Sequence, residues 1–231
     1  MDVVEDLVAA CVQAMAETEP RSAVREAVSR AVADPRLAHT FGEPSAGFDI
    51  LYRSGDLTVL NFTWPPHMRL FPHDHRMWAA IGIYRGREDN RFFRRGGGSI
   101  VPAGGKSLDE RDVLLLGGDA IHAVENPVGT HTGAIHVYGG DFVAQPRSQW
   151  DPNTLVEEPF DLDLVRDEFA RAERAPDTAR AYDAEPPPTL PGTSAAGGAR
   201  LVGARIRRSS ERPGLRRAPT RGANARTPPS R

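Results

Sequence analysis

The sequence predicts a mainly β protein, a sandwich or barrel of short strands with helices at either end. From about Phe41 onward, short apolar runs alternate with Gly, Pro and Asp, which is typical of antiparallel sheets joined by tight turns. Before Phe41, and again beyond Trp150, apolar residues recur instead at helical spacing. The candidate strands are Phe48–Arg53, Leu57–Trp64, Met68–Phe71, Trp78–Tyr84, Asn90–Arg95, Gly98–Val101, Val113–Leu116, Ile121–Val124 and Thr132–Tyr138.

Residues 1–40 are expected to form helices that pack on the barrel. Asp2 with Glu5 resembles a capping box at the start of the first helix. The apolar face of that helix comprises Val4, Leu7, Val8, Cys11 and Met15. The expected role of Cys11 is therefore packing rather than reactivity. In the second helix, after Pro20, the apolar positions repeat at every fourth residue as Val24, Val28 and Val32.

The barrel itself is expected over residues 41–160, followed by a closing helix and linker over 161–186. Within that last segment, Asp163–Arg174 carries apolar residues at helical spacing. Residues 187–231 are rich in Pro, Gly, Ala, Ser and Arg, and their few large apolar residues cannot offset the entropy of ordering the chain. We therefore expect 187–231 to be a disordered tail.

Charge divides the chain into an acidic body and a basic tail. Residues 187–231 hold ten arginines and one acidic residue, a charge of +9, so residues 1–186 carry −11 within the net charge of −2. The acidic body argues against nucleic acid as its ligand. The tail is expected to be a solvated appendage, with contact to RNA or to an acidic surface as the alternative.

Composition also bounds the cellular context. The chain has no apolar run of 18 or more residues and begins without a basic leader, so we expect neither a membrane span nor a secretory signal. Cys11 is the only cysteine, which excludes an internal disulfide. A cytoplasmic protein is expected, and its oligomeric state is left open between monomer and dimer.

Three histidines suggest a metal site. His73 and His75 lie two residues apart, so in an extended chain their imidazoles point to the same face while Asp74 faces away. His122 follows the glycine turn Gly117-Gly118 and lies on a second candidate strand. Imidazole suits Fe, Zn, Cu and Ni better than Mg or Ca. Histidines that merely satisfy hydrogen bonds in the core are the alternative interpretation.

The segments Pro72–Gly86 and Gly117–Pro127 together resemble the two motifs of the cupin superfamily. The resemblance implies a double-stranded β-helix, or jelly-roll barrel. In the usual first motif a glutamate ligand follows the second histidine, whereas Ala79 and Ala80 stand there in this chain. Three imidazoles would leave coordination positions open for exogenous ligands, as oxygen activation requires. Glu88 is the alternative to the missing glutamate ligand, but it lies beyond the glycine turn, and we expect it instead to be exposed or to support a metal ligand by a hydrogen bond.

Residues 48–145 also resemble the cysteine dioxygenase-like thiol dioxygenases, and most closely a bacterial group described as predicted double-stranded β-helix metalloenzymes. The matching elements are His73–His75, His122–Asn126 and the strand Ala134–Tyr138. The resemblance implies Fe(II) on His73, His75 and His122, and a small thiol that is oxidised by O2 to a sulfinate. A non-catalytic cupin that binds a metal or small ligand, or a cupin enzyme of other chemistry using Mn, Ni or Zn, is the alternative.

The resemblance further implies roles for four residues around the metal. His136 and Tyr138, which alternation places on one face of their strand, would be the catalytic residues beside the iron. Arg53 matches the family's arginine for the substrate carboxylate, although an ion pair with Glu125 or Asp49 would explain it equally. Arg147 is the alternative carboxylate anchor, or a surface residue.

Two departures from the family distinguish this chain. Ala134 replaces the family's serine, which shortens the hydrogen-bonded chain through His136 to Tyr138. Ala80 stands where the animal enzymes carry the cysteine that is cross-linked to the tyrosine, so no such cross-link can form here.

Overall fold

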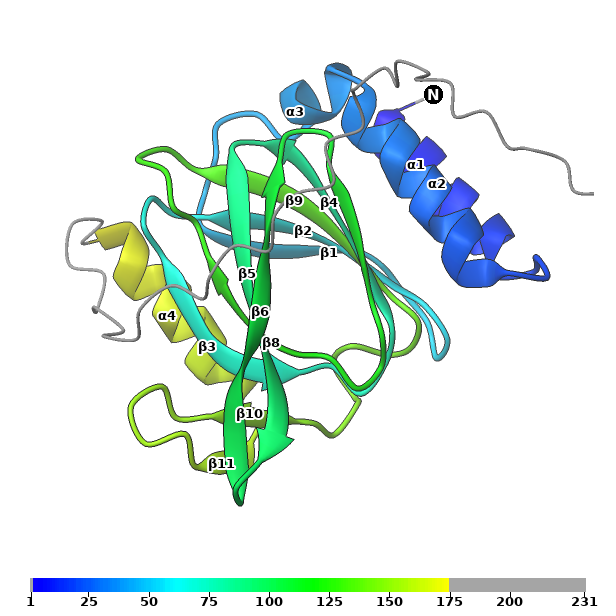
Figure 1. Ribbon diagram of the computed structural model, residues 1–231. Coiled ribbons are helices and arrows are strands. Elements are labelled where there is room, and N and C mark those ends of the chain that lie inside the picture. The colour runs from blue at the N-terminus through cyan, green and yellow to red at the C-terminus, as the bar shows by residue number, and fades with distance from the viewer. Residues whose placement is uncertain (1, 175–231) are drawn as a thin grey trace, which may run out of the picture. The chain divides into compact units, whose positions relative to one another are not determined.

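The computed structural model describes residues 2–174 (Figure 1), so the linker beyond Arg174 and the tail expected at 187–231 lie outside the described residues. The helices are α1 (Val3–Ala14), α2 (Pro20–Ala33), α3 (Arg36–Thr40) and α4 (Leu162–Arg174). The strands are β1 (Gly47–Arg53), β2 (Thr58–Trp64), β3 (Arg69–Asp74), β4 (Ala79–Arg85), β5 (Arg87–Gly96), β6 (Ser99–Asp109), β7 (Val113–Leu116), β8 (Ile121–Glu125), β9 (Thr132–Tyr138), β10 (Ser148–Trp150) and β11 (Glu157–Pro159).

The strands form two antiparallel sheets whose pairing defines the fold. The first sheet has the order β1-β2-β9-β4-β7 and the second β11-β10-β3-β8-β5-β6. Taken from the two ends of the barrel sequence toward its middle, β2 pairs with β9, β3 with β8, β4 with β7 and β5 with β6. This is one long hairpin wound up so that successive strand pairs fall in alternate sheets. The predicted double-stranded β-helix, or jelly roll, is thereby confirmed.

The interior between the two sheets is apolar and aromatic at one end. Phe62 and Trp64 stack with ring centroids 5.1 Å apart, and Phe169 of α4 stacks on Trp64 at 4.9 Å. Val165 and Phe169 are the inward residues of α4 and are buried. The closing helix thus covers the end of the barrel at which these aromatic rings lie.

The N-terminal helices pack on the outer face of the first sheet, where α2 contacts β4, β7 and β9 (Figure 1). Val24, Val28 and Val32 are all buried there, as the four-residue repeat predicts. Gly82 makes this close packing possible, because a Cβ atom at that position would lie 2.4 Å from the Val28 side chain. Cys11 is fully buried, and burial raises the pKa of its thiol to about 12, which agrees with a packing role.

Some elements depart from the sequence-based expectation. The sequence does not predict α3, β10 or β11, because each has five residues or fewer and shows no periodicity. The strand expected at Met68–Phe71 continues through Pro72 to Asp74, and the strand expected at Gly98–Val101 continues to Asp109. None of the helices within residues 2–174 is long and apolar enough to cross a membrane.

Candidate metal centre

A β-bulge brings the first two histidines into the barrel. The register of β3 against β8 shifts between Leu70 and His73, yet Leu70, His73 and His75 all line the same interior hollow. Phe71 and Pro72 lie between Leu70 and His73 on β3, opposite the single residue Ala123 on β8, so β3 carries one extra residue. Proline has no N–H to donate to a ladder and is tolerated in a strand at such a bulge. The bulge therefore re-aims His73, and the i, i+2 spacing brings His75 to the same side.

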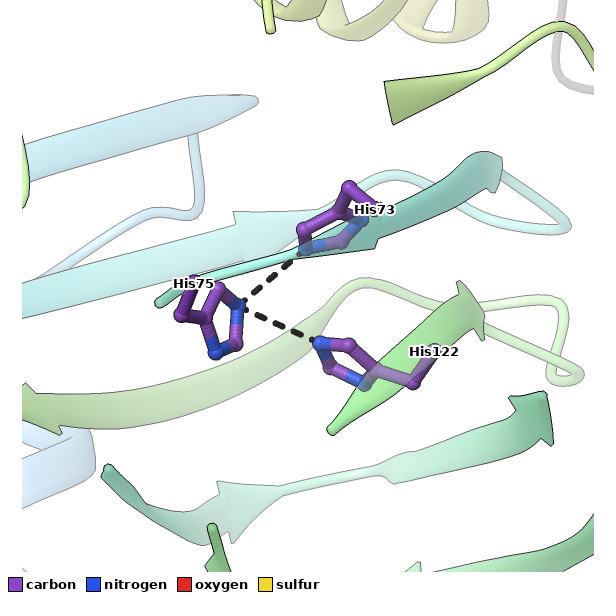
Figure 2. Close-up of side chains that lie close together, drawn as sticks. All are labelled: His73, His75 and His122. Carbon is purple, nitrogen blue, oxygen red and sulfur yellow. Dashed lines mark hydrogen bonds between the residues drawn. The ribbon is translucent and has the colours of Figure 1, made fainter. Parts of the chain in front are cut away.

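The three histidines converge through their Nε2 atoms (Figure 2). Nε2 of His75 lies 3.2 Å from Nε2 of His73 and 3.2 Å from Nε2 of His122. All three side chains are buried. Donors held about 2.1 Å from one ion at angles between about 90° and 110° would lie roughly 3.0–3.4 Å apart. His73, His75 and His122 thus form a buried group that can hold a metal ion.

Hydrogen bonds fix the tautomers of two of these histidines. His73 donates its Nδ1–H to the carbonyl oxygen of Phe71 at 3.0 Å, and His122 donates its Nδ1–H to Oδ1 of Asn90 at 2.6 Å. Both Nε2 atoms therefore carry a free lone pair that faces His75. A single proton on His75 can satisfy only one of them, whereas a cation satisfies all three nitrogens together. The donor set consequently fits a metal.

Burial keeps these imidazoles neutral. It lowers the pKa of His73 to about 4. It also lowers the pKa values of His75 and His122 well below 6.5, aided at His75 by His122 and His73 and at His122 by His73 and His136. Metal ligation requires the neutral imidazole. The site is therefore ready to take a cation near pH 7 without first losing protons.

His136 and Tyr138 lie on β9 of the opposite sheet and line the same hollow as the three histidines. The ring of Tyr138 stands edge-on to His75 with centroids 4.9 Å apart. The Tyr138 hydroxyl lies 3.1 Å from Nδ1 of His136, and burial raises the pKa of that hydroxyl. The alternation expected for Ala134–Tyr138 thus brings both side chains beside the histidine cluster.

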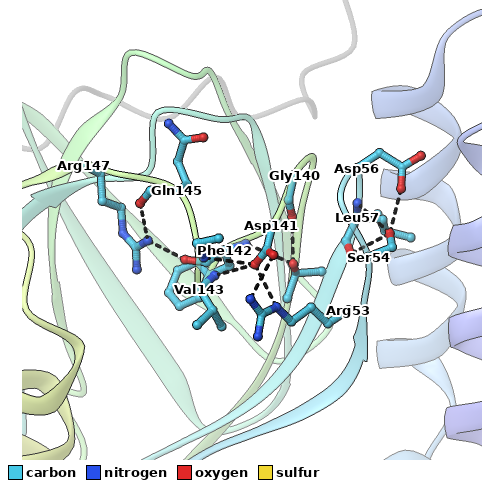
Figure 3. Close-up of polar contacts among 12 residues, drawn as sticks. Arg53, Ser54, Asp56, Leu57, Gly140, Asp141, Phe142, Val143, Gln145 and Arg147 are labelled. Atoms are coloured by element: carbon cyan, nitrogen blue, oxygen red, sulfur yellow. Dashed lines mark hydrogen bonds and ion pairs between the residues drawn. The ribbon is translucent and has the colours of Figure 1, made fainter.

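The two predicted arginines lie in different environments (Figure 3). Arg53 makes a bidentate ion pair with Asp141, with Nε–Oδ1 at 2.8 Å and Nη2–Oδ2 at 2.9 Å. Its side chain is 40% exposed and lies outside the set of residues that line the hollow. Arg53 is therefore not brought together with the histidines, and its partner is neither Glu125 nor Asp49.

Arg147 is buried, with 7% of its surface exposed. Its Nη1 bonds the carbonyl oxygens of Phe142 at 2.5 Å and Gln145 at 3.2 Å, while Nε and Nη2 have no hydrogen-bond partner within the described residues. The guanidinium carbon lies 4.1 Å from the Phe142 ring centroid and 3.8 Å from that of Phe160. Desolvation lowers the pKa of Arg147 to about 10, so it remains a cation at neutral pH.

The hollow in front of the histidines has mostly apolar walls. Its lining comprises Phe48, Phe62, Trp64, Leu70, His73, His75, His122, Val124, His136, Tyr138, Phe142, Phe160, Leu162 and Val165. Phe142 and Phe160, which sandwich Arg147, are part of this wall. Arg147 itself is not among the lining residues, so it contacts the wall of the hollow through these two rings.

The sequence gives no role to Asn90 and leaves the role of Glu88 open between an exposed residue and one that supports a metal ligand. Both face the barrel interior from β5, where they alternate with the partly exposed Asp89. Glu88 is fully buried, which excludes the expected exposed position and leaves the expected supporting one, and it accepts a hydrogen bond from Nδ2 of Asn90 at 2.9 Å. Their two-residue spacing was the available signal, although it shows its meaning only once β5 is paired with β8.

Comparisons with known proteins give weak similarities. No protein-family model matches the chain. A cupin superfamily protein from Desulfitobacterium hafniense DCB-2 is similar at 14% identity and a TM-score of 0.36, over 44% of this chain and 86% of that one. An RmlC-like cupin family protein with a double-stranded β-helix fold, from Methanocaldococcus jannaschii, is similar at 9% identity and a TM-score of 0.37, over 44% of this chain and 86% of that one. A mutant of oxalate decarboxylase from Bacillus subtilis is similar at 14% identity and a TM-score of 0.32, over 38% of this chain and 22% of that one. The double-stranded β-helix is assigned from the chain's own strand pairing.

Proposed function

We propose that this protein is a mononuclear non-haem iron dioxygenase that oxidises a small thiol, of the cysteine or mercapto-acid type, to its sulfinate with O2. The observation that carries the proposal is the convergence of three neutral imidazoles, from His73, His75 and His122, on a buried hollow with apolar walls. Within residues 2–174, no carboxylate joins this ligand group. The chain thus supplies three donors and leaves room for exogenous ligands.

Fe(II) is the ion that we propose for the three Nε2 atoms. Bound there, iron supplies the redox chemistry by which both atoms of O2 are transferred to the thiol sulfur. The chain's own contribution is to fix the tautomers of His73 and His122 and to surround the site with apolar side chains. Those side chains exclude water, which strengthens the polar interactions that remain in the hollow.

Arg147 is the residue that we propose for the substrate's carboxylate. A buried guanidinium with two unpartnered groups, Nε and Nη2, is costly unless an anion pairs with it. Its electrostatic influence reaches His73 and His75, whose pKa values it helps to lower after the larger effect of burial. Arg53 differs, because a carboxylate, that of Asp141, already pairs with its Nε and Nη2.

Tyr138 is the proposed polar contact for the reacting end of the substrate. Its hydroxyl is buried in the wall of the hollow, beside His75, and lies within hydrogen-bond distance of His136. His136 would orient this hydroxyl rather than touch the substrate itself. The family's serine is not needed for this arrangement, because Glu88 lies on the other side of the His136 ring, 3.4 Å from Nε2.

Oxygen consumption tests the proposal. Protein loaded anaerobically with Fe(II) should consume one O2 per thiol oxidised when cysteine, mercaptopropionate, cysteamine and mercaptosuccinate are supplied in turn. With 18O2, both oxygens of the sulfinate product should carry the label. Iron-loaded protein that consumes no oxygen with any of these thiols would overturn the proposed reaction.

A metal-binding protein of other chemistry is the second candidate. An all-imidazole donor set also suits Zn, which commonly binds three histidines and a water molecule. Metal analysis of protein purified without added metal discriminates between the candidates. Zinc at one equivalent, with no gain of oxygen consumption after replacement by iron, would favour the second candidate.

A further inference from the structure

Two hydrogen-bonded arms from opposite sheets end on one buried carboxylate. On the first arm, Nδ1 of His122 lies 2.6 Å from Oδ1 of Asn90, and Nδ2 of Asn90 lies 2.9 Å from Oε1 of Glu88. On the second arm, the Tyr138 hydroxyl lies 3.1 Å from Nδ1 of His136, and Nε2 of His136 lies 3.4 Å from Oε2 of Glu88. All five side chains are buried.

The chemistry of a carboxylate sets the direction of every bond in both arms. Glu88 as a carboxylate only accepts, so Asn90 must direct its NH2 group, and His136 its Nε2–H, toward it. Asn90 then presents Oδ1 to His122, which must carry its proton on Nδ1 and leave Nε2 bare. His136, with its proton on Nε2, has a bare Nδ1 that accepts the Tyr138 hydroxyl proton.

We propose that Glu88 is the positioning residue that keeps Nε2 of His122 free for the metal and makes the Tyr138 oxygen a hydrogen-bond acceptor toward the hollow. The proposal rests on the metal-binding half of the proposed function and is independent of thiol oxidation. The proton of the Tyr138 hydroxyl is directed to His136. The proposal therefore predicts that the Tyr138 oxygen accepts a hydrogen bond from a ligand and does not donate one to it. A carboxylate that merely joins the two sheets would not fix either imidazole.

The first test uses the metal-free wild-type protein, so it does not depend on any variant folding. Two-bond ¹H–¹⁵N spectra distinguish protonated from bare ring nitrogens. We expect His122 to be protonated on Nδ1 alone and His136 on Nε2 alone. The opposite tautomer of His122, or a His136 that is opposite or protonated on both nitrogens, would overturn the proposal.

The second test exchanges the acceptor at position 88. In Glu88→Gln, an NH2 group must face either Asn90 or His136, so one arm has to reverse. If Asn90 turns, the His122 proton moves to Nε2 and affinity for Zn(II), measured against a chelator, should fall by about 10- to 100-fold, as is common when the support of a ligand is lost. If the arm through His136 reverses instead, the spectra should show that the His136 proton has moved from Nε2 to Nδ1. A variant that changes neither property would overturn the proposal.

A double variant restores the direction of both arms. In Glu88→Gln with Asn90→Asp, the amide at 88 donates to the carboxylate at 90 and still accepts from His136, while position 90 still accepts from His122. The property lost in the single variant should return. Glu125→Gln is the matched control, because Glu125 lies on neighbouring β8 but pairs outward with Arg69 at 2.9 Å. A double variant no better than Glu88→Gln would overturn the proposal.

The readouts separate this inference from the proposed reaction. Tautomers are read without metal, and affinity is read with Zn(II), so neither depends on oxygen consumption. Absence of thiol oxidation with the expected tautomers would overturn the reaction alone. Oxidation of a thiol by a protein whose His136 carries its proton on Nδ1 would overturn the role of Glu88 alone.

Discussion

Asp74, the residue between His73 and His75, accepts a hydrogen bond from the backbone N–H of Ser148 at 2.8 Å. The next residue along β10, Gln149, pairs in register with His73. The segment that ends in Arg147 is therefore fixed against the strand that carries two of the candidate ligands. This contact sets the separation between the candidate metal site and the proposed carboxylate anchor.

Removing that acceptor should destabilise the fold. Asp74→Ala leaves the N–H of Ser148 without its partner and also removes the Arg76 contact at 2.6 Å, so the free energy of unfolding should fall by about 1–3 kcal/mol. Asp74→Asn should lose less, because its amide oxygen still accepts from Ser148. Urea unfolding measures both variants. Equal losses would mean that the Ser148 contact contributes nothing of its own.

Each ligand histidine should be needed for tight metal binding. Substitution of His73, His75 or His122 by Ala removes one of three donors, and we expect less than one equivalent of Fe(II) to survive gel filtration. His131→Ala is the control, because His131 pairs with Glu173 and lies outside the lining of the hollow. Full stoichiometry in His122→Ala would show that the third donor has been assigned to the wrong residue.

Substrate kinetics should separate the two arginines. Arg147→Met should raise KM for a mercapto-acid by about 10- to 150-fold, since a charge-assisted hydrogen bond is worth roughly 1.5–3 kcal/mol. KM for an uncharged thiol should change little. Arg53→Met breaks only the ion pair with Asp141, which lies outside the lining of the hollow. This variant should leave both KM values near those of the wild type. The same increase for both thiols in Arg147→Met would instead indicate a structural role.

Tyr138→Phe should slow turnover without releasing the metal. The variant keeps the ring that contacts His75 and removes only the hydroxyl, so metal stoichiometry should stay at one equivalent. Loss of the hydrogen bond that the Tyr138 oxygen accepts from the reacting group should lower kcat by roughly 3- to 10-fold. Steady-state oxygen consumption and metal analysis of the same sample measure the two effects. An unchanged kcat would remove Tyr138 from the catalytic assignment.

The metal-free protein should lose stability in mild acid. Burial lowers the pKa of His73 to about 4 in the folded state, against 6.5 for an ordinary histidine. Between these pH values the unfolded chain binds a proton that the folded chain does not. The free energy of unfolding therefore has its full value above pH 6.5 and decreases as the pH drops toward 4. For His73 alone the loss at pH 4 should be on the order of 3 kcal/mol.

Urea unfolding of chelator-treated protein at several pH values measures this loss. His73→Leu should show a shallower dependence on pH between 6.5 and 4, because the titrating imidazole is gone. His131→Ala should keep the wild-type dependence. A wild-type protein whose stability is constant over that range would show that the histidine cluster is not held neutral by burial.

Local pattern in the sequence determined the strands and the histidine cluster. Val113–Leu116 and Thr132–Tyr138 were predicted with the bounds that β7 and β9 have. Most other strands were predicted within a few residues, because alternation and turn residues are properties of neighbouring positions. The i, i+2 spacing of His73 and His75, together with His122 after a glycine turn, was enough to predict the group that converges in the barrel.

The tertiary structure alone decided which polar groups meet. Arg53 and Asp141 are 88 positions apart, and nothing local indicates that they pair. Arg147 comes between short segments without periodicity, so its burial between two phenylalanine rings depends on how the chain folds back along β3. Glu88 follows a glycine turn that looked exposed, yet the pairing of β5 with β8 turns it into the barrel. Periodicity fixes which face a side chain takes, whereas its partner depends on long-range packing that the sequence of one segment does not contain.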